Sequence, residues 1–105
     1  MLPHLFQPIS VRGLTLKNRI VMPPMGTRYA TYGGAVTSKL IDYYAERARG
    51  GVGLIIVQFT VVSPEGLSSL YPLAIWDDGF VPGLRALVEA VHAAGAKVAI
   101  QLAHA

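Results

Sequence analysis

The sequence predicts an α/β fold in which parallel β-strands alternate with crossover helices. Short apolar, β-branched runs alternate with segments of helical periodicity, and this alternation is typical of βαβ units. The run 53–57 is apolar on both faces, as a parallel strand enclosed between two layers is. Three such strands with two crossover helices are consistent with a small open sheet or with the opening of a (β/α)8 barrel.

The N-terminal segment predicts a β-hairpin and then a short strand. Residues 8–18 alternate apolar and polar side chains on both sides of Arg12 and Gly13, where the glycine supplies the turn. Residues 20–22 form the first strand of the predicted sheet. Pro23 ends that strand, because proline cannot donate a hydrogen bond to a neighbouring strand.

A helix is predicted over residues 38–49. Thr37 is placed as its N-cap, and Val36 and Ile41 have the spacing of a hydrophobic staple. Gly50 ends the helix. The apolar stripe has helical spacing and consists of Leu40, Ile41, Tyr44, Ala45 and Ala48.

The second strand is predicted at 53–57, and a long loop follows over 63–78. Pro82 suits the first turn of a second helix, and residues 97–102 form a third strand. The stripe of the second helix consists of Leu84, Leu87, Val88 and Val91.

A complete (β/α)8 barrel needs about 250 residues. An apolar strand at the end of a chain also leaves a sheet edge unpaired. We therefore expect residues 1–105 to be the truncated N-terminal part of a single, larger domain.

The composition excludes several classes of protein. Of the 105 residues, 52% are hydrophobic and 14% are charged, so the chain is not kept unfolded by charge repulsion. It has no cysteine, which excludes disulfides and thiol catalysis, fits a reducing compartment and leads us to expect a cytoplasmic location. The formal net charge of +3 comes from scattered residues, so no nucleic-acid partner is predicted.

Membrane and metal functions are not predicted either. The chain has no apolar run of the roughly 18–20 residues that a spanning helix needs, and its N-terminus does not have the pattern of a signal peptide. No histidines and carboxylates have the spacing of metal ligands.

The polar residues at the strand ends are the candidates for chemistry. Ligands in parallel α/β folds lie beyond the carboxyl ends of the strands. The amide of Gln101 suits the edge of a heterocycle that carries carbonyls and ring nitrogens, or equally a hydrogen bond to a neighbouring loop. Gln58 ends the second strand and is compatible with either face of it. Met22 and Met25 suit core packing as well as a ligand contact.

Five segments of the chain, in this order, match the pattern of one known family. They are KNRIVMPPM (17–25), YYAERA (43–48), GVGLII (51–56), SPEG (63–66) and IQLAHA (100–105). Together they resemble the old yellow enzymes, FMN-dependent NAD(P)H:flavin oxidoreductases that include ene-reductases and the dienoyl-CoA and enoate reductase branch. Each segment alone is weak, whereas the conjunction is specific and spans essentially the whole chain.

The resemblance implies a (β/α)8 barrel whose N-terminal hairpin closes its bottom, with FMN as cofactor and NADH or NADPH as reductant. The implied reaction moves a hydride from NAD(P)H through FMN to an activated C=C bond of an α,β-unsaturated carbonyl or enoyl compound. The 105 residues alone are expected to be inactive. The family's substrate-anchoring histidines and proton-donating tyrosine follow the third strand, so no catalytic residue is assigned within this chain.

The resemblance also implies roles for individual residues. The flavin ring is lined by Pro23, Pro24, Met25 and Gly26. Phe59 lies beside the flavin at the end of the second strand. Gln101 binds the pyrimidine edge, where a hydrogen-bond donor stabilises negative charge on the reduced ring. Arg28 falls where some relatives have an active-site tyrosine, and Tyr29 is adjacent to it; these two residues are the substrate candidates.

Two of these positions depart from the family pattern. Many relatives have cysteine or threonine at Gly26, and glycine removes that side-chain contact with the flavin. Relatives often have a small residue near Phe59, where the backbone comes close to the flavin, and this chain has a large aromatic side chain there.

Two other functions are open on the sequence. An inactive part of a barrel would act only as an assembly module, through the open edge of its last strand. A flavin-free barrel enzyme, such as an isomerase or aldolase, is disfavoured because no catalytic lysine, histidine or carboxylate is recognised at a strand end. The expected partners are a small-molecule substrate and the remainder of the barrel, and a homo-oligomer is compatible with the sequence.

Overall fold

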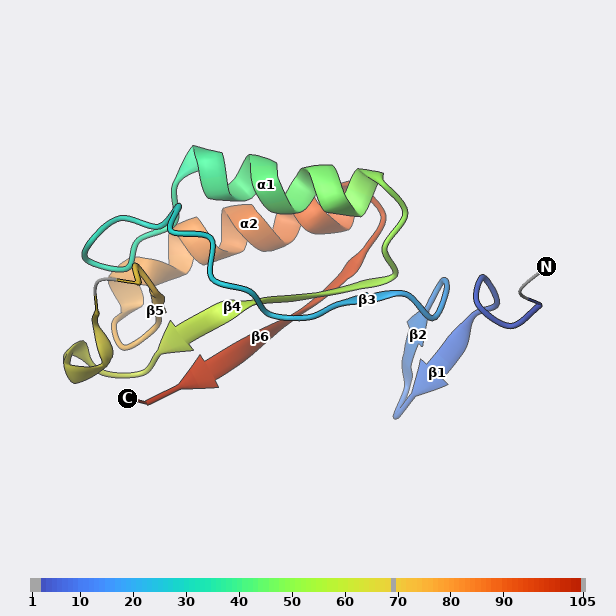
Figure 1. The fold of residues 1–105 in the computed structure, drawn as a ribbon, viewed down its shortest axis with the longest axis horizontal. Helices are drawn as coiled ribbons and strands as arrows, with labels where there is room; N and C mark the ends of the chain where they lie inside the picture. Colours follow the sequence, from blue (N-terminus) through green and yellow to red (C-terminus); the bar gives the residue numbers. More distant parts are fainter. Residues whose placement is uncertain (1–2, 69, 105) are drawn as a thin grey trace.

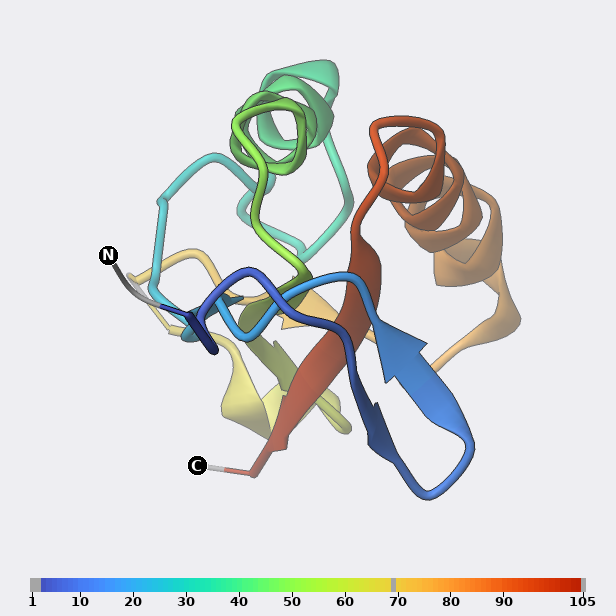
Figure 2. The same cartoon turned by 90° about the vertical axis from the view of Figure 1, so that its right-hand side faces the viewer.

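The computed structural model describes residues 3–68 and 70–104 as a parallel sheet with both helices on one face and a separate hairpin (Figure 1). The end-on view shows α1 and α2 side by side above the strands, with no helix on the opposite face in the described residues (Figure 2). One face of the sheet is therefore covered and the other is open.

The predicted N-terminal hairpin is confirmed. Strands β1 (Ile9–Val11) and β2 (Leu14–Leu16) pair antiparallel. Arg12 and Gly13 form the turn between them with φ angles of 47° and 85°, and two positive φ angles are what a type I′ turn requires. The hairpin lies beyond the amino ends of the sheet strands (Figure 1).

Strand β4 (Leu54–Val61) is the centre of the sheet. Strands β3 (Val21–Met22) and β5 (Leu73–Ala74) run parallel to its two ends, and β6 (Lys97–Ala103) runs parallel along its length. Strand β6 pairs with β4 both where β3 does and where β5 does. Because a strand has only two edges, β3 and β5 lie along the edge of β4 opposite β6.

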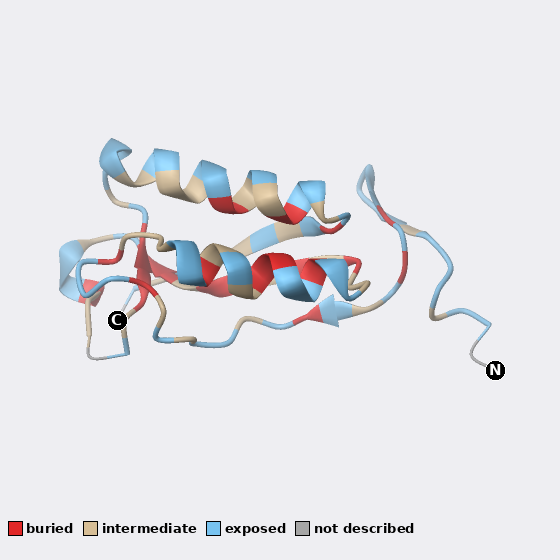
Figure 3. Cartoon of the chain, turned by 90° about the horizontal axis from the view of Figure 1, so that it is seen from above, coloured by how far each residue is buried: buried red, intermediate tan, exposed pale blue. Residues whose placement is uncertain are grey.

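The helices form where their capping and apolar spacing predict. Helix α1 (Ser38–Arg49) has the predicted range, and the Thr37 hydroxyl accepts a hydrogen bond from the Leu40 N–H at 3.1 Å. Helix α2 (Val81–Ala93) begins one residue before Pro82. Seen from above, each helix carries both buried and exposed residues (Figure 3). The buried core includes Leu40, Tyr44 and Ala48 of α1, Leu87 and Val91 of α2, and Ile55 and Val57 of β4.

Two predicted boundaries were wrong. The second strand runs to Val61 instead of ending at residue 57, because polar residues beyond Val57 find hydrogen-bond partners inside the fold. The predicted loop 63–78 contains β5 and the short 3₁₀ turn Pro64–Gly66. A strand of two residues is too short to show an alternating pattern.

Gly34 is predicted to be intolerant of substitution, whereas Gly33 is tolerant. Gly34 has φ +95°, and a Cβ built on it would lie 2.5 Å from the Ala74 Cβ, whereas a Cβ on Gly33 meets no atom within 4 Å. We expect Gly34→Ala to lower the free energy of unfolding by about 1–3 kcal/mol, through backbone strain and displacement of β5. Urea unfolding would measure this, with Gly33→Ala as the matched control. Equal losses in the two variants would contradict the prediction.

Candidate functional site

The carboxyl ends of β4 and β6 lie at the same edge of the sheet. Parallel pairing aligns Val57 with Ile100 and Thr60 with Leu102, so Gln101 lies level with residues 58 and 59 of the central strand. The chain that leaves β3 reaches this level too, because the Thr27 N–H and hydroxyl both donate to Oε1 of Gln58. Three segments far apart in the sequence therefore meet at one end of the sheet.

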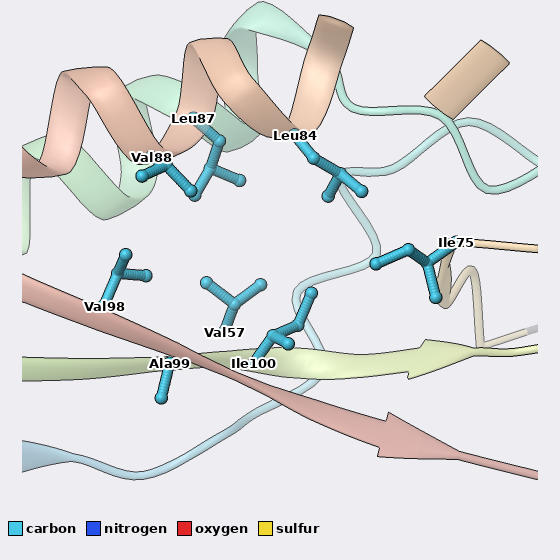
Figure 4. A pocket seen from close by; sticks show the side chains of 8 residues that line it. All are labelled: Val57, Ile75, Leu84, Leu87, Val88, Val98, Ala99 and Ile100. Atoms are coloured by element: carbon cyan, nitrogen blue, oxygen red, sulfur yellow. The ribbon is translucent and has the colours of Figure 1, made fainter. Parts of the chain in front are cut away.

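The side chain of Gln101 belongs to the open face of the sheet. Val98 and Ile100 point toward α2, whereas Ala99 points away from it (Figure 4). Side chains alternate along a strand, so Gln101 lies on the same face as Ala99. The Gln101 side chain is exposed, and no hydrogen bond to its amide is found in the described part of the chain. Its donors and acceptor are therefore free to bind a ligand.

The segment between β3 and Thr27 also offers free polar groups. No hydrogen bond to the N–H of Met25 or Gly26 is found within the described residues, and Met25 is 47% exposed. A Cβ built on Gly26 meets no atom within 4 Å, so the space beside this backbone is open. Pro23 and Pro24 have no N–H, so Met25 and Gly26 are the first backbone donors after β3.

Gln58 is fully buried, although the sequence left its face undecided. Its Oε1 accepts from the Thr27 N–H at 3.2 Å and from the Thr27 hydroxyl at 2.7 Å. Its Nε2 donates to the Tyr71 carbonyl oxygen at 3.1 Å, and its backbone N–H donates to the Tyr44 hydroxyl at 2.9 Å. A buried amide needs such partners, and Gln58 finds them in two loops and a helix.

An irregularity in the pairing of β4 with β6 explains this geometry. Between the pairs Val57–Ile100 and Thr60–Leu102, β4 advances three residues while β6 advances two. This is the count of a β-bulge, and one β4 residue is left out of the ladder. Beside this irregularity the Gln58 N–H donates to the Tyr44 hydroxyl. Phe59 follows directly and is partly exposed.

The environment of Tyr44 changes its acidity. The pKa of Tyr44 is raised to about 12, and burial of the ring is the largest cause. The hydrogen bond from the Gln58 N–H lowers the pKa, and the neighbouring Tyr43 raises it. The hydroxyl therefore stays neutral through the physiological range and acts as a hydrogen-bond acceptor for β4.

The structure separates the two substrate candidates. The Tyr29 ring meets the Tyr43 ring edge-on, with centroids 5.7 Å apart, and Lys39 Nζ lies 4.3 Å from the Tyr29 centroid. Tyr29 thus packs on α1. Arg28 is exposed and has φ +61°, an uncommon backbone conformation for a residue with a side chain.

The sequence missed two residues that shape this site, Thr27 and Tyr71. Thr27 lies in a stretch without periodicity. The only feature of the sequence that places it near the site is its position four residues after Pro23, which ends the first strand. Tyr71 contributes only its carbonyl, which no side-chain pattern reveals.

An apolar cavity of about 230 Å³ lies between α2 and the sheet (Figure 4). It is lined by Val57, Ile75, Leu84, Leu87, Val88, Val98, Ala99 and Ile100. These side chains offer no hydrogen-bonding group, so the cavity does not match the polar edge of a heterocycle. The candidate site is the open strand ends.

Two negative findings concern residues 3–68 and 70–104. No cluster of three or more histidine, cysteine, aspartate or glutamate side chains there has the geometry to hold a metal ion. None of the helices in these residues combines the length and the apolar character needed to cross a membrane.

Parallel strands with polar groups at their carboxyl ends are the arrangement by which parallel α/β proteins, barrels included, bind ligands. Comparison with known proteins identifies the family. The model of the NADH:flavin oxidoreductase / NADH oxidase family matches residues 4–105. The chain belongs to this family, that of the old yellow enzymes, and the family resemblance of the sequence is confirmed.

The relatives are longer proteins. The chain is 52% identical over 103 residues to an NADPH dehydrogenase of Halalkalibacterium halodurans, covering 96% of this chain and 30% of that protein. It is 47% identical over 104 residues to an NADH oxidase of Thermoanaerobacter brockii, covering 98% of this chain and 16% of that protein. The chain thus spans less than a third of the length of either relative.

Solved structures agree with the predicted fold class. The old yellow enzyme homologue from Zymomonas mobilis superposes with a TM-score of 0.87 at 40% identity, over 97% of this chain and 28% of that one. A 2-naphthoyl-CoA reductase in complex with 2-naphthoyl-CoA gives a TM-score of 0.94 at 28% identity, over 99% and 16%. The described sheet and helices therefore correspond to part of a (β/α)8 barrel.

Removal of the Tyr44 hydroxyl is predicted to destabilise the fold. Tyr44→Phe leaves the buried Gln58 N–H without its acceptor, so we expect the free energy of unfolding to fall by about 1–3 kcal/mol. Chemical denaturation would measure the loss. Tyr43→Phe is the matched control, because no hydrogen bond to the Tyr43 hydroxyl is found in the described residues and its ring contacts persist in phenylalanine. A loss as large in Tyr43→Phe would contradict this role for Tyr44.

The stability conferred by Tyr44 is predicted to decline at high pH. The pKa of Tyr44 is about 12 in the folded state against 10.0 for the free side chain. Between these values the unfolded chain has lost this proton while the folded chain keeps it, so the free energy of unfolding falls as pH rises. We expect the stability difference between the wild type and Tyr44→Phe to shrink above about pH 10. A constant difference from pH 8 to 11.5, in denaturation series at about half-unit steps, would show that the folded pKa is not raised.

Proposed function

We propose that residues 1–105 are the N-terminal part of a single FMN-binding barrel domain, and that the whole protein is a flavin-dependent oxidoreductase. In this proposal it moves a hydride from NAD(P)H to the activated C=C bond of an α,β-unsaturated carbonyl or enoyl compound. The observation that carries the proposal is the exposed Gln101 amide, which has no hydrogen-bond partner among the described residues and, by strand alternation from Ala99, lies on the face of the sheet opposite the helices.

The residues present fit a flavin ring. Gln101 offers both a donor and an acceptor, as the carbonyls and ring nitrogens of the pyrimidine edge require. The N–H groups of Met25 and Gly26 are further donors beside open space. Phe59 is partly exposed at the same level of β4. FMN, when bound, supplies the hydride chemistry, and these residues hold and orient its ring.

The Gln101 amide also fits the electronic demand of the reaction. Reduction places negative charge on the pyrimidine side of a flavin, and a fixed donor there favours the reduced form. Pro23 and Pro24 restrict the backbone before Met25, because their rings fix φ. The donors are therefore presented by a stiff segment.

Relatives support the remaining parts of the proposal. A solved morphinone reductase is in complex with tetrahydroNAD, and the 2-naphthoyl-CoA reductase above binds a CoA ester. We propose NADH or NADPH as the reductant on this basis, with Arg28 and Tyr29 contacting a small-molecule substrate. A cytoplasmic location, and the absence of nucleic-acid and membrane partners, stay predictions.

Substitution of Gln101 tests the proposal. In the complete protein, we expect Gln101→Leu to weaken FMN binding at least about tenfold, because the pyrimidine edge loses its hydrogen bonds. Quenching of FMN fluorescence during titration of the apoprotein gives the dissociation constant.

Lys97→Leu is the matched control, since Lys97 lies on the same strand and face but at the opposite end of β6. FMN affinity in Lys97→Leu should stay that of the wild type. Failure of the wild-type protein to bind FMN would overturn the proposed function. Wild-type affinity in Gln101→Leu would remove Gln101 from the site.

A further inference from the structure

We propose that Gln58 is the positioning residue of the flavin site, holding the segment 23–26 in place through Thr27 and joining it to the loop that contains Tyr71. The inference rests on the proposed function and deepens it. It concerns a side chain that is itself fully buried and acts on the cofactor only through its neighbours.

The segment 23–26 needs an external anchor. Its preceding anchor is the pairing of Met22 with Ile55 in the sheet. No hydrogen bond to the backbone of residues 23–26 is found outside the strand pairing in the described part of the chain. The next fixed point is Thr27, whose N–H and hydroxyl both bind Gln58. The proposed flavin donors at Met25 and Gly26 therefore lie between two anchors, and Gln58 is one of them.

The orientation of the Gln58 amide is determined by its partners. Both Thr27 groups donate, so they require an acceptor, and the Tyr71 carbonyl requires a donor. A reversed amide would oppose donor to donor and acceptor to acceptor. The planar side-chain amide of Gln58 thus sets the distance between the Thr27 segment and the Tyr71 segment.

The loop after β4, which contains Tyr71, is also attached to the loop after β3. Tyr71 has φ +53°, a conformation that costs free energy in a residue with a side chain and persists where the surroundings fix it. Its ring meets the Tyr32 ring edge-on at 6.0 Å, and the Ala74 N–H donates to the Gly34 carbonyl at 2.9 Å. The loop after β3 is therefore joined to residues 71–74 at three points, and Gln58 makes the one nearest in sequence to residues 23–26.

Gln58 lies at the β-bulge of β4, and its backbone is bonded to α1 there. Its N–H donates to the Tyr44 hydroxyl. Helix, strand and both loops thus converge on one residue. A change at Gln58 should loosen the wall of the flavin site without altering any atom that contacts the flavin.

Two measurements on the complete protein test the inference, with Gln58→Met as the principal variant because methionine keeps the length and removes the amide. Hydrogen–deuterium exchange of the apoprotein reports on residues 25–31, which include the Thr27 N–H. Titration with FMN gives the dissociation constant. We expect exchange in this segment to rise, and FMN affinity to fall, by at least about tenfold.

Asn18→Ala is the matched control for stability. Asn18 is also buried and polar, with Nδ2 donating to the Gly51 carbonyl at 2.7 Å and Oδ1 accepting from the Ile20 N–H at 3.0 Å. These bonds lie at the amino ends of the strands. Asn18→Ala should lower the melting temperature while FMN affinity and exchange in residues 25–31 stay within about threefold of the wild type.

A double-mutant cycle with Thr27→Val adds a milder variant. If Gln58 acts through Thr27, the double variant should bind FMN no more than about threefold more weakly than Gln58→Met, instead of showing multiplied losses. Additive losses would overturn the inference. So would unchanged exchange and affinity in Gln58→Met, or equal effects in Asn18→Ala. A wild-type protein that binds no FMN would instead overturn the proposed function, and exchange in the apoprotein would still test the anchor.

Discussion

Every part of the sheet depends on the two-sided pairing of β4. The strand pairs with β6 along one edge and with β3 and β5 along the other, so it has no edge exposed at either end. Its Ile55 and Val57 are buried against both helices. A strand used in this way must be apolar where it meets the helices. The exceptions, Gln58 and Thr60, are buried with hydrogen bonds to defined partners.

The polar exceptions occur where the ladder is irregular, and this is the end of the strand that lies nearest the proposed site. A β-bulge releases backbone groups from the sheet, and those groups must find other partners or lose stability. In this chain the Tyr44 hydroxyl accepts from the Gln58 backbone N–H, while the Gln58 side-chain amide bonds to the Thr27 segment and to the Tyr71 carbonyl. The loops at the carboxyl ends are therefore attached to the sheet through side chains, in addition to their chain connections.

The elements that sequence reasoning predicted are those specified by local interactions. The range of α1 follows from the Thr37 cap and from an apolar stripe whose members are three or four residues apart, so both signals are local in the sequence. The β-bulge and β5 depend on contacts between segments distant in the sequence, such as the pairing of Thr60 with Leu73. No periodicity within a single segment encodes them.

The same distinction applies to the candidate site. Gln101 could be singled out as a candidate, because a polar residue interrupts an apolar strand near its carboxyl end, but the pattern alone does not decide between a ligand and a neighbouring loop as its partner. The burial of Gln58 could not be predicted, because alternation does not hold across a bulge. Thr27 acquires its role only when the fold brings it to Gln58, 31 residues further along the chain.

The chemistry of the open face confines the site to one end of the sheet. Along β6 this face carries Lys97, Ala99 and Gln101, so its amino end is cationic, its middle is small and apolar, and its carboxyl end offers an amide. The Gln101 amide offers both a donor and an acceptor to a neutral heterocycle with carbonyl and imide groups, whereas the Lys97 ammonium at the other end only donates. The Gln101 amide therefore lies at the carboxyl end of the sheet. The loops that follow β3 and β4 lie at this same end.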